Sequence, residues 1–122
     1  MPITLESAPL LFAIGGAGYV MIELLWRRRS HVSMFLAGGL CLIIILHLHN
    51  GPAPFPLKCL LAGLSITAVE FAFGCVVNLW LKLDVWDYSR HRFNVLGQVC
   101  LLYSVLWCGL GTAVLGVLAA VA

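Results

Sequence analysis

Four long apolar runs, separated by short polar segments, make up almost the whole chain. The runs lie at residues 8–26, 33–48, 56–81 and 96–121. A helix needs about 20 residues to cross the hydrocarbon core of a bilayer, and the second run reaches that length only with help from its flanking residues. The pattern therefore predicts an all-α, polytopic membrane protein whose residues 1–122 form one domain of four transmembrane helices.

The composition agrees with this pattern. Hydrophobic residues make up 62% of the chain and charged residues only 10%, whereas soluble domains carry about 25% charged residues. The net charge of +2 is small, and basic side chains at a membrane edge find a sufficient partner in anionic lipid headgroups. We therefore expect membrane lipids as partners and no nucleic acid.

The Lys and Arg residues are distributed unevenly between the two sides of the predicted bundle. All but Lys58 lie at the loops that follow the first and third runs: Arg27, Arg28, Arg29, Lys82, Arg90 and Arg92. Lys and Arg favour the cytoplasmic side of a membrane when they lie in short loops. We therefore expect these two loops in the cytoplasm and both termini outside.

Glu70 is the strongest candidate for function, because it lies inside the third apolar run. A charge at mid-helix depth costs about 2.5 to 3.5 kcal/mol on insertion scales, so this carboxyl must be neutralised, paired or facing a polar group. At about 100° per residue, Glu70 shares one face of the helix with Gly63, Thr67, Gly74 and Asn78. Two interpretations stay open: a packing seam around a protonated or hydrogen-bonded Glu70, or a polar binding pocket centred on it.

The end of the first run carries a second group of polar residues. Glu23 precedes Arg27 by four residues, which is the favourable order for an ion pair on a helix. This pair either anchors the helix end or belongs to the site, and Tyr19 lies one turn deeper, where its hydroxyl could reach the same site. His31, beside the arginine run, could carry a proton or donate to a lipid headgroup.

Small residues recur at four-residue spacing in the fourth run, at Thr112, Gly116 and Ala120. This pattern suits close helix packing, either within the chain or between two copies. Four helices enclose little volume for a solute, so we expect a homo-oligomer, with a dimer as the default.

The segment at residues 82–94 is the most polar part of the chain. Asp87 and Ser89 can close a turn through their side chains, and Asn94 is a candidate N-cap for the fourth helix. The histidines offer no compact metal site, since His47 and His49 lie on opposite sides of a helix. We therefore expect neither a metal nor a cofactor.

The polar residues occur in an order that resembles a known family, the small bacterial membrane proteins described as ABC-transporter type IV, or CmpB-like, permeases. The likeness runs through Tyr19, Glu23, Arg27, His31, Glu70, Gly74, Asn78, Trp86-Asp87-Tyr88-Ser89 and Phe93-Asn94 to Gly97-Gln98. The Trp-Asp-Tyr-Ser segment and the Phe-Asn-x-x-Gly-Gln segment are its most specific parts. Arg90-His91-Arg92 stands where relatives carry Asn and Pro.

This resemblance implies a four-span protein of the bacterial cytoplasmic membrane with a characteristic polar set. The set comprises Glu23, Arg27, His31, Glu70, Asn78, Asp87 and Asn94. The chain contains no Walker A sequence, so any ATP-driven role would need a separate ATPase or partner subunit.

Two functional hypotheses follow. The leading one is a permease-like protein that binds or moves a small solute or ion at Glu70, with Tyr19 and Asn78 as hydrogen-bonding partners. The substrate-binding set would then be Glu70, Asn78, Tyr19, Glu23, Arg27, His31, Asp87 and Asn94. The alternative is an intramembrane enzyme acting on a lipid or lipid-linked substrate, because the order around Asp87 is also similar to that of lipoprotein signal peptidases. Its catalytic groups would be Asp87 with Glu70, Glu23 or His31, since hydrolysis with two carboxyl groups needs one base and one acid.

Overall fold

The computed structural model describes residues 7–28 and 31–121. Within these ranges the chain forms α1 (Ala8–Arg27), α2 (Val32–Asn50), α3 (Phe55–Gly74) and α4 (Leu101–Val121), and a short π-helix, η1 (Cys75–Trp80), continues α3. The helices α1, α2 and α4, together with α3 and η1 taken as one, are each long and apolar enough to cross a membrane. The predicted all-α fold with four membrane-spanning helices is confirmed. Arg29 lies outside the described residues.

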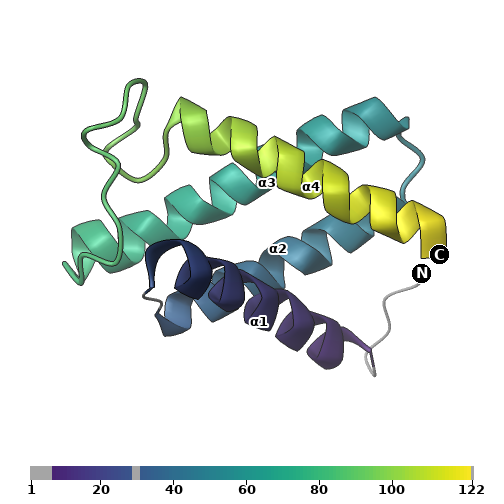
Figure 1. The fold of residues 1–122 in the computed structure, drawn as a ribbon, viewed down its shortest axis with the longest axis horizontal. Helices are drawn as coiled ribbons and strands as arrows, with labels where there is room; N and C mark the ends of the chain where they lie inside the picture. Colours follow the sequence, from purple (N-terminus) through teal and green to yellow (C-terminus); the bar gives the residue numbers. More distant parts are fainter. Residues whose placement is uncertain (1–6, 29–30, 122) are drawn as a thin grey trace.

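The helices run up and down, so successive connections lie at opposite ends of the molecule (Figure 1). One end, which we call the loop end, holds the end of α1, the start of α2 and the loop at residues 81–100. The start of α1, the turn between α2 and α3, and the end of α4 lie at the other end. α1 packs along α2, α3 packs along α4, and α2 also contacts both α3 and α4.

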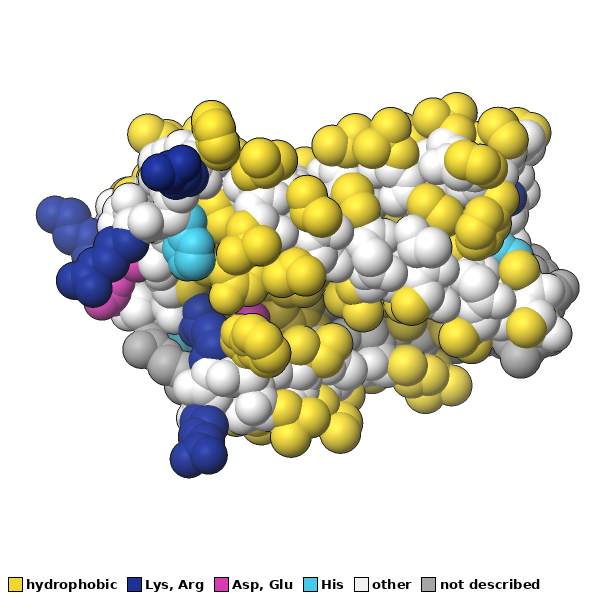
Figure 2. Space-filling model, turned by 45° about the horizontal axis from the view of Figure 1, so that its top comes forward, with side chains coloured by type: hydrophobic (Ala, Val, Ile, Leu, Met, Phe, Trp, Pro, Cys, Tyr) yellow, Lys and Arg dark blue, Asp and Glu magenta, His cyan; other side chains and the backbone are white. Residues whose placement is uncertain are grey.

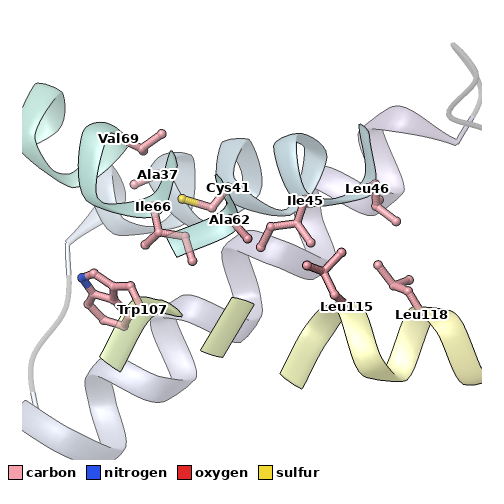
Figure 3. Close-up of a cluster of buried hydrophobic side chains, with 10 residues drawn as sticks. All are labelled: Ala37, Cys41, Ile45, Leu46, Ala62, Ile66, Val69, Trp107, Leu115 and Leu118. Carbon is pink, nitrogen blue, oxygen red and sulfur yellow. The ribbon is translucent and has the colours of Figure 1, made fainter. Parts of the chain in front are cut away.

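The main hydrophobic core lies between α2, α3 and α4 (Figure 3). Its buried members come from these three helices: Ala37, Cys41, Ile45, Leu46, Ala62, Ile66, Val69, Trp107, Leu115 and Leu118. The buried residues of α1 are only Gly16 and Glu23, so this helix lies at the edge of the bundle. The backbones of α1 and α2 lie very close together there. If Gly15 carried a Cβ atom, that atom would lie only 2.6 Å from the carbonyl oxygen of Gly38, so a glycine is needed at this contact.

Hydrophobic side chains cover the flanks of the molecule, whereas Lys and Arg side chains gather at the loop end (Figure 2). The described basic residues of that end are Arg27, Arg28, Lys82, Arg90 and Arg92, and Lys58 belongs to the first turns of α3 at the other end. There its ammonium group donates to the carbonyl oxygen of His49 at 2.8 Å. In a membrane, the apolar flanks would contact the hydrocarbon core and the basic end would lie at the level of the headgroups.

The start of the fourth helix differs from the prediction. α4 begins at Leu101 rather than at residue 96, because the chain turns at Leu96 (φ 55°) and Gly97 (φ 73°), both in the left-handed region. The prediction that Asn94 caps this helix is therefore wrong. Its side-chain amide donates to the carbonyl oxygen of His91 at 2.8 Å instead, inside the loop.

Candidate functional site

Glu70 lies on α3 with its carboxyl group inside the bundle. The residue is 4% exposed, and the Tyr19 hydroxyl of α1 donates to its Oε2 at 3.3 Å. The other oxygen, Oε1, is buried and makes no hydrogen bond of good geometry with a described residue, while the indole N–H of Trp107 acts on the same carboxyl group. The structure thus brings together Tyr19 and Glu70, whose positions in the sequence are far apart, and leaves one carboxyl oxygen able to accept a hydrogen bond.

The ion pair expected at the end of α1 is present beside this carboxyl group. Arg27 Nε lies 2.8 Å from Oε2 of Glu23, and Glu23 is 7% exposed. Both groups are near enough to act electrostatically on Glu70. Two carboxyl groups and one guanidinium group of the described residues therefore share this region.

Trp107 of α4 completes the group, and sequence reasoning missed it. The residue is 8% exposed, its ring centroid lies 5.9 Å from that of Tyr19, and it neighbours Glu70. Its buried Nε1 makes no hydrogen bond of good geometry with a described residue. The available signal was a tryptophan inside an apolar run, because a buried indole N–H usually needs a partner. We call Tyr19, Glu23, Arg27, Glu70 and Trp107 the Glu70 cluster.

Asn78 was expected beside Glu70, but its amide group is used elsewhere. It donates to Gln98 Oε1 at 2.8 Å and accepts from the backbone N–H of Val85 at 2.7 Å. Gln98 is 3% exposed, and its carbonyl oxygen accepts from Trp86 Nε1 at 2.9 Å. Asn78 and Gln98 therefore fasten the loop at residues 81–100 to the end of α3.

His31 stands at the N-terminus of α2 and acts as its cap. Its Nδ1 accepts from the backbone N–H of Ser33 at 3.1 Å, and the hydroxyl of the same residue lies 2.9 Å from that nitrogen. A ring nitrogen that accepts a backbone N–H satisfies one of the free donors of a helix N-terminus. This arrangement gives His31 a structural role at the loop end.

Asp87 and Asn94 hold the loop together from within. Asp87 is exposed, and its Oδ1 accepts from the Ser89 N–H at 2.8 Å. This hydrogen bond holds the pKa of the Asp87 carboxyl below its usual range. The side chain of Asn94 accepts from the Gly97 N–H at 3.0 Å, and the Gly97 carbonyl accepts from the Tyr88 N–H at 2.7 Å. The two most specific segments of the sequence are thus bonded to each other.

Aromatic rings connect this loop with the Glu70 cluster. Tyr88 stacks on Tyr103 of α4 with ring centroids 4.8 Å apart. The ring centroids of Tyr103 and Trp107 lie 6.2 Å apart. Burial raises the pKa of the Tyr88 hydroxyl. Arg27 makes a second connection, since its Nη2 donates to the carbonyl oxygen of Val85 at 2.6 Å. A displacement of the loop at residues 81–100 would therefore also displace side chains of the Glu70 cluster.

No set of three His, Cys, Asp or Glu side chains within residues 7–28 and 31–121 lies close enough to share a metal ion. The chemistry that the cluster offers is proton or cation binding at a carboxyl group flanked by aromatic rings.

Fold and composition define a small integral membrane protein, with four spanning helices and a buried acidic and aromatic cluster. Residues 10–122 match the family described as "Putative ABC-transporter type IV", and the chain belongs to this family. The resemblance seen in the sequence is therefore confirmed, and it makes the chain a small transporter-like membrane protein. No solved structure matches it.

Proposed function

We propose that this protein is a permease-like component of the bacterial cytoplasmic membrane in which Glu70 binds a proton, a small cation or a substrate amine. One observation carries the proposal: a carboxyl group that is only 4% exposed lies within a spanning helix, flanked by the hydroxyl of Tyr19 and the indole N–H of Trp107. A charge-bearing side chain at that depth costs several kcal/mol, and such residues usually mark a pathway or a binding site.

The neighbours of Glu70 support a binding role. Tyr19 can stabilise the ionised carboxyl by donating to it at 3.3 Å, and the pair of Glu23 and Arg27 lies between it and the loop end. A bound cation would balance the negative charge of Glu70 when its carboxyl group is ionised. Cation binding and release at Glu70 is the elementary step that the proposal assigns to the protein.

Partners form part of the proposal. The family is of the ABC-transporter type, and the 122 residues contain no Walker A sequence, so a separate ATPase subunit would supply ATP hydrolysis. We place its contact at the loop end. The predicted homodimer is supported by α4, where a Cβ on Gly109 or Gly116 would meet no atom within 4 Å. The small-residue face of this helix is therefore free for a second copy.

The enzyme hypothesis pairs Asp87 with Glu70, Glu23 or His31, and the geometry supports it less than it supports binding at Glu70. Asp87 is exposed and bonded to Ser89 within its own loop, and His31 is bonded to Ser33 as the cap of α2. A base and an acid that share a water molecule must lie within hydrogen-bond reach of it.

The test of the transport proposal is cation flux through the protein reconstituted in liposomes together with the subunits that copurify with it. A trapped pH-sensitive dye reports proton flux, and uptake of radiolabelled methylammonium, sodium or potassium ions above that of empty liposomes reports flux of the cation itself. We expect Glu70→Gln to reduce the flux to that of empty liposomes, because the amide cannot carry a charge.

The matched control is Asp84→Asn, which removes an exposed carboxyl group of the loop and should leave the flux unchanged. Insertion and folding of both variants are checked by size-exclusion chromatography and circular dichroism. Wild-type flux from folded Glu70→Gln protein would refute the proposed role of Glu70.

A further inference from the structure

A cleft of about 210 Å³ lies between α1 and α4, with α2 and α3 as its floor. Its lining is apolar and includes Ile14 and Ile22 of α1, Leu42 of α2, Ile66 of α3, and Leu110 and Val114 of α4. Ile14 is 53% exposed, so the α1 side of the cleft faces the surroundings of the bundle. In a membrane these surroundings are the acyl chains of the bilayer.

The cleft leads to the Glu70 cluster. Tyr19 and Trp107 line it, and the contact between their rings, with centroids 5.9 Å apart, bridges α1 and α4. The Tyr19 hydroxyl donates to Glu70 from this position. An apolar space open to the bilayer is therefore continuous with two aromatic rings and, behind them, a buried carboxyl group.

We propose that the cleft binds the apolar part of an amphiphilic organic cation whose ammonium group lies at Glu70. This inference rests on the proposed function of Glu70 as a cation-binding group and names the class of its substrate. The ligand enters sideways from the bilayer, with its alkyl chain between α1 and α4.

Charge selects this occupant over other amphiphiles. The Glu70 cluster holds two carboxyl groups and one guanidinium group, so its carboxylates would repel an anionic headgroup and attract a cationic one. An ammonium group at Glu70 can donate to Oε1, which makes no hydrogen bond of good geometry with a described residue. The rings of Tyr19 and Trp107 add to this preference, because aromatic faces attract cations, most strongly where water is excluded.

The size of the cleft limits the apolar part. An apolar cavity of about 150 Å³ accommodates benzene, and pockets for drug-sized ligands begin at about 300 Å³. The cleft, at about 210 Å³, lies between these values. It suits a single alkyl chain of medium length, and octylammonium is an appropriate probe.

The test measures protection of Glu70 from dicyclohexylcarbodiimide, a reagent that modifies carboxyl groups inside membranes. The full chain is embedded in phosphatidylcholine nanodiscs, and loss of the unmodified Glu70 peptide is followed by mass spectrometry, so that amides or esters formed when the added amine or alcohol attacks the activated carboxyl group count as modification. Ammonium, butylammonium and octylammonium ions are compared with neutral 1-octanol. We expect octylammonium to protect at much lower concentration than ammonium, and 1-octanol to give no protection.

Gly18 allows the cleft to be filled without disturbing the packing. It lines the cleft, and a Cβ at this position would meet no atom within 4 Å. Gly18→Leu should raise the half-protecting concentration of octylammonium about tenfold, which corresponds to about 1.4 kcal/mol, because the leucine side chain would occupy part of the cleft that Gly18 lines. The effect of ammonium should stay unchanged, because the small ion does not need the cleft.

Two variants serve as matched controls on α1. Gly18→Ala removes the glycine without filling the cleft, and Ala17→Leu adds a leucine at an exposed position that does not line it. Both should behave as the wild type. Because octylammonium partitions equally into all these nanodiscs, a difference between variants reports the cleft itself. Equal labelling without any cation shows that the variants are folded alike.

The outcomes separate this inference from the proposed function. If ammonium protects as well as octylammonium, or if Gly18→Leu has no effect, the amphiphile inference is wrong and cation binding at Glu70 stands. Protection by 1-octanol equal to that by octylammonium would also refute it, since the occupant would then be a neutral chain. If no cation protects and Glu70→Gln transports normally, the proposed function itself is wrong.

Discussion

Burial separates the roles of two carboxyl groups, those of Glu70 and Asp87. Glu70 is 4% exposed, so its ionised form must be stabilised by Tyr19, Trp107 or a ligand. Asp87 is exposed, and its Oδ1 accepts a hydrogen bond from the Ser89 N–H. A solvated carboxylate in a turn stabilises local structure, whereas a desolvated one is available for binding.

The Asp87 carboxyl group predicts how the order of the loop at residues 81–100 depends on pH. Its pKa is lowered in the folded protein, chiefly by the hydrogen bond from the Ser89 backbone N–H. A lowered pKa means that the stabilisation is complete above the ordinary value of about 3.9 and is lost as the pH falls through the folded-state pKa. The loop should therefore stay ordered from neutral pH to about pH 4 and loosen only below it.

Fluorine NMR of the protein labelled with fluorotryptophan measures this transition. The Trp86 signal, assigned through Trp86→Phe, reports the loop because its indole N–H donates to Gln98. In Asp87→Asn the acid transition of this signal should disappear, since the amide does not titrate. An identical transition in both proteins would show that another group controls the loop.

At the level of elements, side-chain hydrogen bonds hold the loop at residues 81–100. Asn78 fastens it to the end of α3, because its amide group pairs with both Gln98 and Val85. Gly97 is required where it stands, since its φ is 73° and a Cβ would lie 3.0 Å from Asp87 Oδ1. The segments on which the family resemblance rests at this end of the chain therefore build the loop.

Asn78→Ala should destabilise the protein by about 1 to 3 kcal/mol, because it leaves the Val85 N–H and Gln98 Oε1 without their partner. The free energy of unfolding is measured by titration from mild detergent into dodecyl sulfate. Arg92→Ala is the control, since it shortens an exposed side chain of the same loop. Equal stability of the two variants would contradict the role of Asn78 in fastening the loop.

The fold could be predicted from the sequence where local hydrophobicity decides the structure. The apolar runs located all four spanning helices, because a bilayer admits few alternatives to a helix. The true start of α4 could not be predicted, since the turn before it depends on pairing between Tyr88 and Gly97 and on positive φ at Leu96.

The site was predictable to a similar degree. Glu70 and the pair of Glu23 and Arg27 stood out as charges at membrane depth. Trp107 did not stand out, because a tryptophan in an apolar run is indistinguishable from a residue of the hydrophobic core until its neighbours in the structure are known. Asn78 was assigned to Glu70 from a shared helix face, but the end of that helix is a π-helix, and its tertiary partner is Gln98.

At the scale of the whole molecule, the charge distribution predicts one orientation in the membrane. Among the described basic residues, Lys58 alone lies at the end of the bundle opposite the loop end. Such an asymmetry favours a single topology with the basic end in the cytoplasm. Two copies in one membrane would then be parallel, with both loop ends on the side where an ATPase subunit works.

Cysteine labelling tests this orientation. In a background with the native cysteines replaced, Pro52→Cys lies in the turn between α2 and α3, and Leu83→Cys lies in the loop at residues 81–100; both positions are exposed. A membrane-impermeant maleimide added to intact cells should modify Pro52→Cys and spare Leu83→Cys until the membrane is opened. The reverse pattern would show that the topology is the opposite one. Labelling of both positions to about half would indicate that the protein inserts in two orientations, which would exclude a dimer that is always parallel.

Replacing Arg90 and Arg92 by Ser should weaken the preference for one orientation, because positive charges in a short loop favour its cytoplasmic position.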